Sequence, residues 1–162
     1  MGNTTLNEIT SKIISVIQEA VDKTGSWPGL RVLPELIKNK NQGICFCLFH
    51  VELETIFYNR PISKNDILQP IETLPLNLYY HLSAKSINSS NEEDALEEQR
   101  LMTVAMKALH NYSRIIYSVS AEQIILRIEN TNMSLSESID YWAANKSPMR
   151  LTAYYKVSGV LL

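Results

Sequence analysis

The sequence predicts an α+β fold, a mixed, mostly antiparallel sheet packed with an N-terminal helix, a central helix and a short third helix. Two observations predict it. Apolar residues recur at three- and four-residue steps in some segments and alternate every second residue in others. The order of these segments lacks the regular strand–helix–strand rhythm of a parallel α/β sheet. The length of 162 residues is usual for one domain, so we expect a single domain over residues 1–162.

The N-terminal helix is expected to begin after Thr5, which forms a capping-box pattern with Glu8. Gly25 is a typical helix stop. The break at residues 27–29 then opens an extended segment that reaches Leu36. The apolar stripe of the helix consists of Leu6, Ile9, Ile13, Val16, Ile17 and Ala20.

Two long strands are predicted in the first half of the chain. The strand from Gly43 to Phe57 begins with residues that are apolar on both faces, which predicts cover on both sides there. From His50 onward it becomes amphipathic, with two glutamates on one face and Val51 and Leu53 on the other. From Leu76 to Lys85 apolar and polar residues alternate, which predicts a strand with one buried face. The irregular segment Asn59–Leu74 lies between them, and a loop of this length in a compact domain is usually functional or mobile.

Two further helices follow. Ser90 and Glu93 form a capping pair before the central helix, which ends near His110. Ser134 and Glu137 form the same pattern before a short helix. The face of this short helix that we expect to be buried carries Leu135, Ile139 and Trp142.

Two more strands complete the predicted sheet, one over residues 123–129 and one over residues 150–162. The last strand is apolar and uncharged from Val157 onward, although chain ends are normally polar. It therefore forms either a central strand of the chain's own sheet or a strand that adds to a neighbour's sheet. Gly159 marks a bulge or a close backbone approach in both cases.

Charge and hydropathy exclude two classes of function. The formal net charge is -2, so the chain has no basic footprint for a nucleic-acid partner. The apolar runs are far shorter than a membrane span, which excludes membrane insertion by a helix. The N-terminus lacks a basic stretch followed by an apolar run, so we expect the protein to fold in the cytoplasm.

The sequence carries no motif for catalysis or for a cofactor. His50, His81 and His110 do not stand in a motif with a nucleophile. The five glycines form no phosphate-binding loop. Cys45 and Cys47 have no further Cys or His at ligand spacing, so we expect two reduced thiols. We therefore expect no enzyme, no cofactor and no metal, and an active site assembled from scattered residues is the alternative.

Candidate contact residues fall into four groups. Apolar residues of the irregular segment either contact a partner or cluster beneath their own loop. Tyrosines on the polar strand faces are either interface anchors or rim packing. Acidic residues at the start of the central helix are either a solvated helix end or a docking face for a basic partner. The candidates are Ile62, Ile67, Leu68 and Ile71; Tyr79 and Tyr154; Glu92, Glu93, Asp94 and Glu97; and Val157, Val160, Leu161 and Leu162 of the last strand.

Four stretches in this order resemble a known family. They are LPLNLYYHLSA at Leu74–Ala84, EEQRLMTVAMKALH at Glu97–His110, SESIDYW at Ser136–Trp142 and MRLTAYYKVS at Met149–Ser158. Together they resemble the N-terminal domain of the cap, or tail-terminator, proteins of extracellular contractile injection systems, which are phage-tail-like particles. The resemblance implies a tail-terminator-like fold over most of the chain.

The resemblance also implies a structural function. It predicts a six-fold homo-oligomeric ring that ends the tube and sheath at the end far from the baseplate, with the inner tube protein and the sheath protein as partners. Such a cap covers the unpaired edges of a polymer end and offers no new copy of them. Assembly would take place in a bacterial cytoplasm, before the particle is released. The alternatives are another structural subunit of the particle, such as a baseplate or tube-initiating component, and, third, an unrelated small enzyme.

Overall fold

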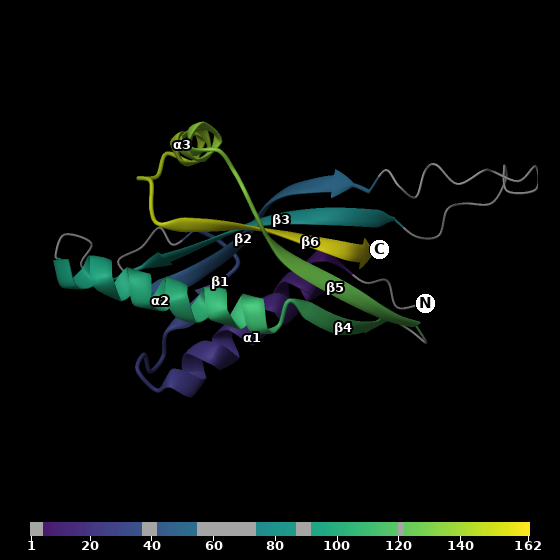
Figure 1. The fold of residues 1–162 in the computed structure, drawn as a ribbon, viewed down its shortest axis with the longest axis horizontal. Helices are drawn as coiled ribbons and strands as arrows, with labels where there is room; N and C mark the ends of the chain where they lie inside the picture. Colours follow the sequence, from purple (N-terminus) through teal and green to yellow (C-terminus); the bar gives the residue numbers. More distant parts are fainter. Residues whose placement is uncertain (1–4, 37–41, 55–73, 87–91, 120–121) are drawn as a thin grey trace, which may run out of the picture.

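A computed structural model describes residues 5–36, 42–54, 74–86, 92–119 and 122–162 (Figure 1). Three helices and six strands occur in these ranges. In chain order they are α1 (Leu6–Thr24), β1 (Arg31–Leu33), β2 (Gly43–Leu53), β3 (Pro75–Lys85), α2 (Glu92–Asn111), β4 (Arg114–Val119), β5 (Glu122–Thr131), α3 (Leu135–Ala144) and β6 (Thr152–Leu161).

The strands form one sheet in the order β1-β2-β3-β6-β5-β4. The β1–β2 pair is parallel, and all other pairs are antiparallel. The predicted α+β class with a mixed, mostly antiparallel sheet is therefore confirmed. The last strand, β6, lies between β3 and β5, so it is a central strand of the chain's own sheet.

Gly159 forms the irregular point that was expected in β6. Its φ is 78°, and a Cβ added to it would lie 2.5 Å from the carbonyl oxygen of Ile125 in β5. The register between β3 and β6 shifts in the same region, between Leu76 and Leu78. A residue without a side chain is required there because the backbones of β5 and β6 approach closely.

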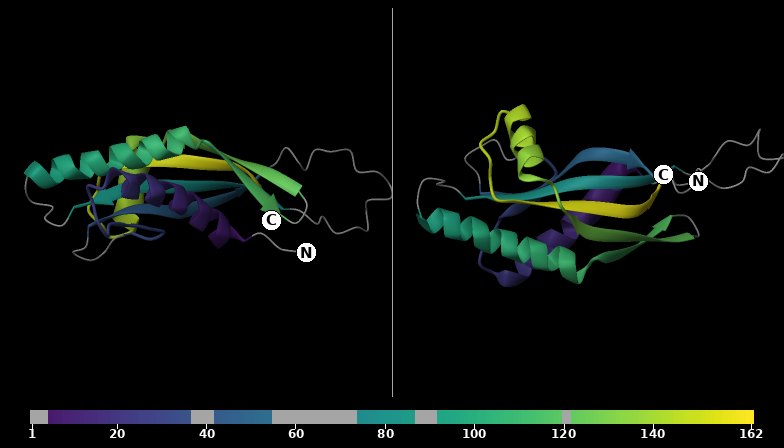
Figure 2. Two further views of the ribbon diagram at one scale, coloured as in Figure 1. Left: turned by 90° about the horizontal axis from the view of Figure 1, so that it is seen from below. Right: turned by 45° about the horizontal axis from the view of Figure 1, so that its top comes forward.

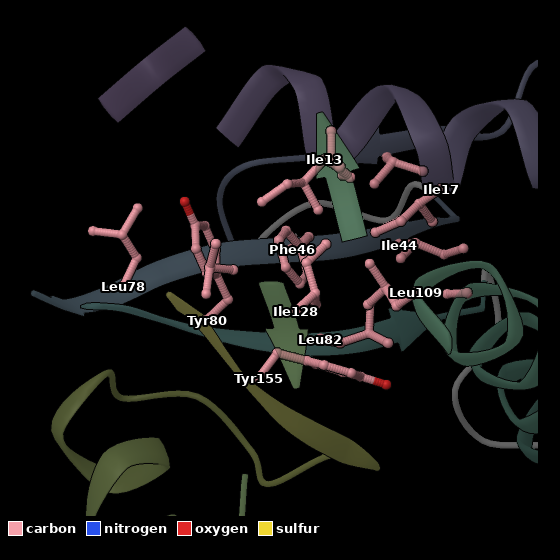
Figure 3. Packing of buried hydrophobic residues seen from close by; sticks show 14 of the residues in the cluster. Ile13, Ile17, Ile44, Phe46, Leu78, Tyr80, Leu82, Leu109, Ile128 and Tyr155 are labelled. Carbon is pink, nitrogen blue, oxygen red and sulfur yellow. The ribbon is translucent and has the colours of Figure 1, made fainter. Parts of the chain in front are cut away.

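The main core lies between one face of the sheet and the helices α1 and α2. Figure 3 shows Ile13 and Ile17 of α1 above Ile44 and Phe46 of β2. Phe46 stacks on Tyr80 of β3 with ring centroids 4.5 Å apart. The capping box predicted at the start of α1 is present, as is the one before α3. The Ser90–Glu93 pair includes Ser90, which lies outside the described residues.

Helix α3 covers part of the opposite face (Figure 1), which corrects the prediction for β3. That strand was expected to have one buried face, but His81 and Ser83 on its second face are also buried. The expectation of cover on both sides holds for the first residues of β2, but the apolar face expected in its second half is not buried. Residues 44–46 are buried, whereas Val51 and Leu53 are exposed because nothing in the described structure covers that end.

The predicted buried face of α3 was also wrong. Trp142 is buried as expected, but Leu135 and Ile139 are exposed, and Ser138 is buried instead. Ser138 and Trp142 are four residues apart and so share one side of the helix. This side points to the sheet, where the hydroxyl of Ser138 and the ring of Trp142 contact residues of the strands.

Candidate interaction surfaces

A buried polar cluster holds α3 on the sheet. His81 of β3 is fully buried, and its Nδ1 lies 2.8 Å from the hydroxyl of Tyr141 in α3. Its Nε2 lies 3.4 Å from Sγ of Cys45 in β2. The hydroxyls of Tyr154 and Ser138 are 2.6 Å apart. Burial lowers the pKa of His81 to about 4, so the imidazole is neutral at pH 7.

Aromatic rings complete this cluster. Phe49 lies with its ring centroid 5.2 Å from that of Tyr141 and 5.9 Å from that of Tyr154. The ring of Trp142 lies edge-on to His81 at 5.7 Å. Polar contacts and ring packing therefore both fix the position of α3, and the cluster is a docking site for this chain's own helix.

The thiols of the cluster are free. A hydrogen bond with Cys47, followed by burial, raises the pKa of the Cys45 thiol, so this thiol stays protonated and is a poor nucleophile. No group of three or more His, Cys, Asp or Glu side chains within the described residues is placed to hold a metal ion. The helices of the described ranges include none long and apolar enough to cross a membrane.

Beyond the end of α3, no helix among the described residues covers the same sheet face. Tyr79 of β3 is half-buried there, and its hydroxyl donates to Oε2 of Glu52 over 2.6 Å, an arrangement that raises the pKa of Tyr79 to about 12. Nζ of Lys156 lies 6.0 Å from the centroid of the same ring. Tyr79 thus remains partly accessible as a contact residue.

The β4–β5 hairpin exposes an apolar pair on this open face. Ile116 and Ile125 are directly opposite each other, and their exposed fractions are 62% and 50%. Two residues further along, Arg114 is opposite Arg127, and both are exposed. Because β4 is the last strand of the sheet, its outer edge carries backbone groups that no strand of the described sheet pairs.

A groove runs between the loop after α1 and the first half of α2. It has a volume of about 560 Å³ and includes Trp27, Leu96 and Val104. An adjoining hollow of about 360 Å³ extends it to Glu93 and Asp94. Among the described residues, three carboxylates and one guanidinium, that of Arg100, lie around the groove, so its rim is acidic on balance. The apolar part is accessible because Leu96 is 47% exposed.

The acidic residues at the start of α2 have different environments. Asp94 accepts a hydrogen bond from the hydroxyl of Ser86 over 2.6 Å. Glu97 accepts one from the indole of Trp27 and pairs with Arg100 over 3.3 Å. Glu92 and Glu93 are exposed, and the described residues offer them no hydrogen-bond or ion-pair partner. Asp94 and Glu97 therefore take part in contacts within the chain, whereas Glu92 and Glu93 face solvent.

A third hollow, of about 450 Å³, lies where the end of β5 meets α3. Three methionines line it, together with Leu135, which is 67% exposed. Unbranched methionine side chains adapt to partners of different shape. The methionines are Met106, Met133 and Met149.

The structure places the predicted contact residues unequally. Of the two alternatives left open for Tyr154, packing describes its place in the single chain, because α3 covers the ring and leaves it 6% exposed. Val157 and Val160 are core residues, and Leu161 and Leu162 are half-buried. The loop candidates Ile62, Ile67, Leu68 and Ile71 lie outside the described residues.

Sequence reasoning missed the exposed pair Ile116 and Ile125. The alternation over residues 123–129 places Ile124 and Leu126 on one side, but Ile115 and Ile116 stand side by side in a segment that was not predicted as a strand. The register of the hairpin is needed to show that, of two isoleucines adjacent in sequence, one faces the core and the other faces outward.

Two solved structures have a similar fold. One is the sheath/tube terminator of PVC, an extracellular contractile injection system, in its extended state; the TM-score is 0.64 at 12% identity, over 100% of this chain and 58% of that chain. The other is the tube-terminating cap of the anti-feeding prophage; the TM-score is 0.68 at 12% identity, over 98% of this chain and 56% of that chain. This chain thus spans somewhat more than half the length of either structure.

At 12% identity these likenesses show the fold, and they confirm the predicted tail-terminator-like architecture. A comparison with curated proteins gives no significant match. The model of the Pvc16 N-terminal domain family, in contrast, matches residues 12–162. Because this match extends over nearly the whole sequence, the chain belongs to the Pvc16 N-terminal domain family.

Proposed function

We propose that this chain is a structural cap domain that terminates the tube and sheath of a contractile injection system. The observation that carries the proposal is the family match over residues 12–162, together with the fold shared with a sheath/tube terminator and a tube-terminating cap. The predicted function rests on a resemblance of sequence, and the likeness of folds supports it independently.

The surfaces of the chain support a role in assembly. A terminator must bind the last layer of a polymer through accessible surfaces. The described part of this chain offers an open sheet face, an apolar groove along α2 and a methionine-lined hollow beside α3. Exposed apolar side chains gathered at such places are typical of protein contacts.

The finer parts of the proposal follow from the predicted resemblance. The cap forms a six-fold ring at the end of the particle far from the baseplate. It contacts the inner tube protein and the sheath protein, assembles in a bacterial cytoplasm and leaves the cell with the particle. It has no catalytic activity, because its role is to occupy a polymer end.

Deletion of the gene in a strain that produces the particles tests this function. If the chain is the terminator, tubes and sheaths still form without it, but their lengths vary widely in electron micrographs, since nothing stops subunit addition. A baseplate or tube-initiating component would behave differently, because without it no tubes start at all. Particles of normal, uniform length after deletion would contradict both functions.

A further inference from the structure

We infer that copies of this chain associate head to tail, with the β4–β5 hairpin of one copy docked in the groove along α2 of the next. The occupant of the groove is thus a second copy of the same chain. The contact would be the subunit interface of the proposed cap, and its assignment to a ring rests on that proposed function. The contact itself is argued from the two surfaces.

The hairpin exposes apolar side chains and two arginines without a carboxylate partner among the described residues. Ile116 and Ile125 form an exposed apolar pair, although the opposite side of both strands already packs on the core. Arg114 and Arg127 stand directly across from each other, and like charges in this position destabilise a strand pair. Among the described residues, no carboxylate pairs with either guanidinium.

The groove along α2 has the complementary character. Its apolar part is formed by Trp27, Leu96 and Val104. The adjoining hollow contributes the exposed carboxylate of Glu93, because Asp94 is already hydrogen-bonded and its second oxygen is buried.

Arg100 lines both hollows as well, and its charge is paired with Glu97. The groove of about 560 Å³ and the adjoining hollow of about 360 Å³ are both open at the surface. An isoleucine pair can cover Leu96, while two arginines reach the exposed carboxylates of Glu92 and Glu93 at the start of α2, a pairing that carboxylates and guanidinium groups form strongly.

The two surfaces cannot meet within one molecule. The start of α2 lies at one end of the helix–sheet layer, and the β4–β5 hairpin lies toward the other end, as both figures show (Figures 1 and 2). A contact between them must therefore join two copies. Because the two surfaces differ, the contact is heterologous, and its repetition leads either to a closed ring or to an open filament.

Charge reversal on each surface, followed by mixing, tests the contact. One variant carries R114E and R127E, and the other carries E92K and E93K, which are the acidic residues that no internal contact uses. Sedimentation velocity of the full chain measures self-association. We expect each variant alone to associate at least about tenfold more weakly than the original chain, since each contact then brings like charges together.

An equimolar mixture of the two variants should restore association. Copies then alternate, and every contact again has one acidic and one basic side. The control variants D140K and K146E change charge in the same two directions at exposed positions on and just after α3, and should leave association unchanged. Circular dichroism of every variant checks that the fold is retained.

Three results would overturn the inference. The first is a mixture that does not restore association, and the second is an equal weakening by the controls. The third is an original chain that stays monomeric up to about 100 µM, a concentration at which even a weak specific contact is populated. None of these results changes what the deletion experiment shows about the proposed function. Conversely, if the mixture assembles as expected but deletion leaves the particles unchanged, the contact stands and the proposed function fails.

Discussion

Nδ1 of His81 lies 2.8 Å from the hydroxyl of Tyr141, and this contact joins the centre of the sheet to α3 across 60 positions of sequence. The same imidazole contacts Sγ of Cys45 through Nε2. A neutral imidazole has one donor and one acceptor nitrogen, so it can satisfy both partners, whereas an imidazolium has two donors and no acceptor. Because burial disfavours the charged ring, protonation of His81 opposes the buried position that α3 covers, and the docking of α3 is linked to the protonation of this ring.

The first prediction is a loss of stability in mild acid. Because the pKa of His81 is lowered from 6.5 to about 4 in the folded chain, the unfolded chain binds more protons between these values. The contribution of neutral His81 to the free energy of unfolding is present above pH 6.5 and is lost as the pH falls toward 4. It amounts to about 3 kcal/mol at pH 4. Urea unfolding at several pH values measures it.

The variant H81Q is the control for this titration. It should be less stable at pH 7, but its free energy of unfolding should fall less steeply between pH 6.5 and 4. Exposed carboxylates such as Glu8 and Glu137, whose pKa values hydrogen bonds lower, contribute equally to both chains. Identical slopes for the two chains would show that His81 does not carry the effect.

The second prediction concerns the close approach of β5 and β6. G159A should destabilise the fold strongly, because a Cβ there meets the carbonyl oxygen of Ile125 at 2.5 Å. Gly29 provides a matched control, since it has the same φ of 78° but no atom within 4 Å of an added Cβ. G29A should cost about 1 kcal/mol of strain, and G159A about 1–3 kcal/mol more. Equal shifts of melting temperature would refute this explanation.

The third prediction is that removal of residues 159–162 prevents folding. Val160 is buried, and the backbone of Leu162 makes two hydrogen bonds with that of Leu74, at 2.8 and 3.1 Å. The truncated chain should be insoluble because its central strand loses core side chains and pairing. A soluble, folded monomer that no longer assembles would show instead that this strand serves a neighbouring copy.

The fourth prediction concerns the methionine-lined hollow. L135S combined with M149S removes exposed apolar surface, so the melting temperature should stay within the small range usual for surface changes. Incorporation into particles should fall, because the partner loses its apolar contact. Immunoblots of purified particles measure incorporation, and A144S at the exposed end of α3 is the control. Unchanged incorporation would remove this hollow from the candidate contacts.

Local patterns predicted the helices and most strands because their signals act over a few residues. The capping boxes at Thr5 and Ser134 and the helix stop at Gly25 appear in the structure as expected. Strand β1 was seen only as an extended segment, because three residues show no period. Strand β4 was not predicted, because Ile115 and Ile116 stand side by side although only one of them is buried.

The contact surfaces were less predictable because they depend on what covers each face. Tyr154 is on a polar-looking face and would be exposed if α3 did not pack over it. Leu135 lies on the same side of α3 as Ser138, but it is the first residue of the helix and is 67% exposed, whereas Ser138 is buried against the hydroxyl of Tyr154. Hydropathy cannot show which turn of a helix the sheet covers. The groove along α2 combines Trp27 with residues about 70 positions away, a proximity that only the fold establishes.

The position of this chain on an intact particle tests the central claim most directly. Cryo-electron microscopy of purified particles, with the chain marked by a bound antibody fragment, locates it. A cap predicts the chain as a ring closing the tube and sheath at the end far from the baseplate. Density at the baseplate, along the sheath or nowhere on the particle would contradict the account.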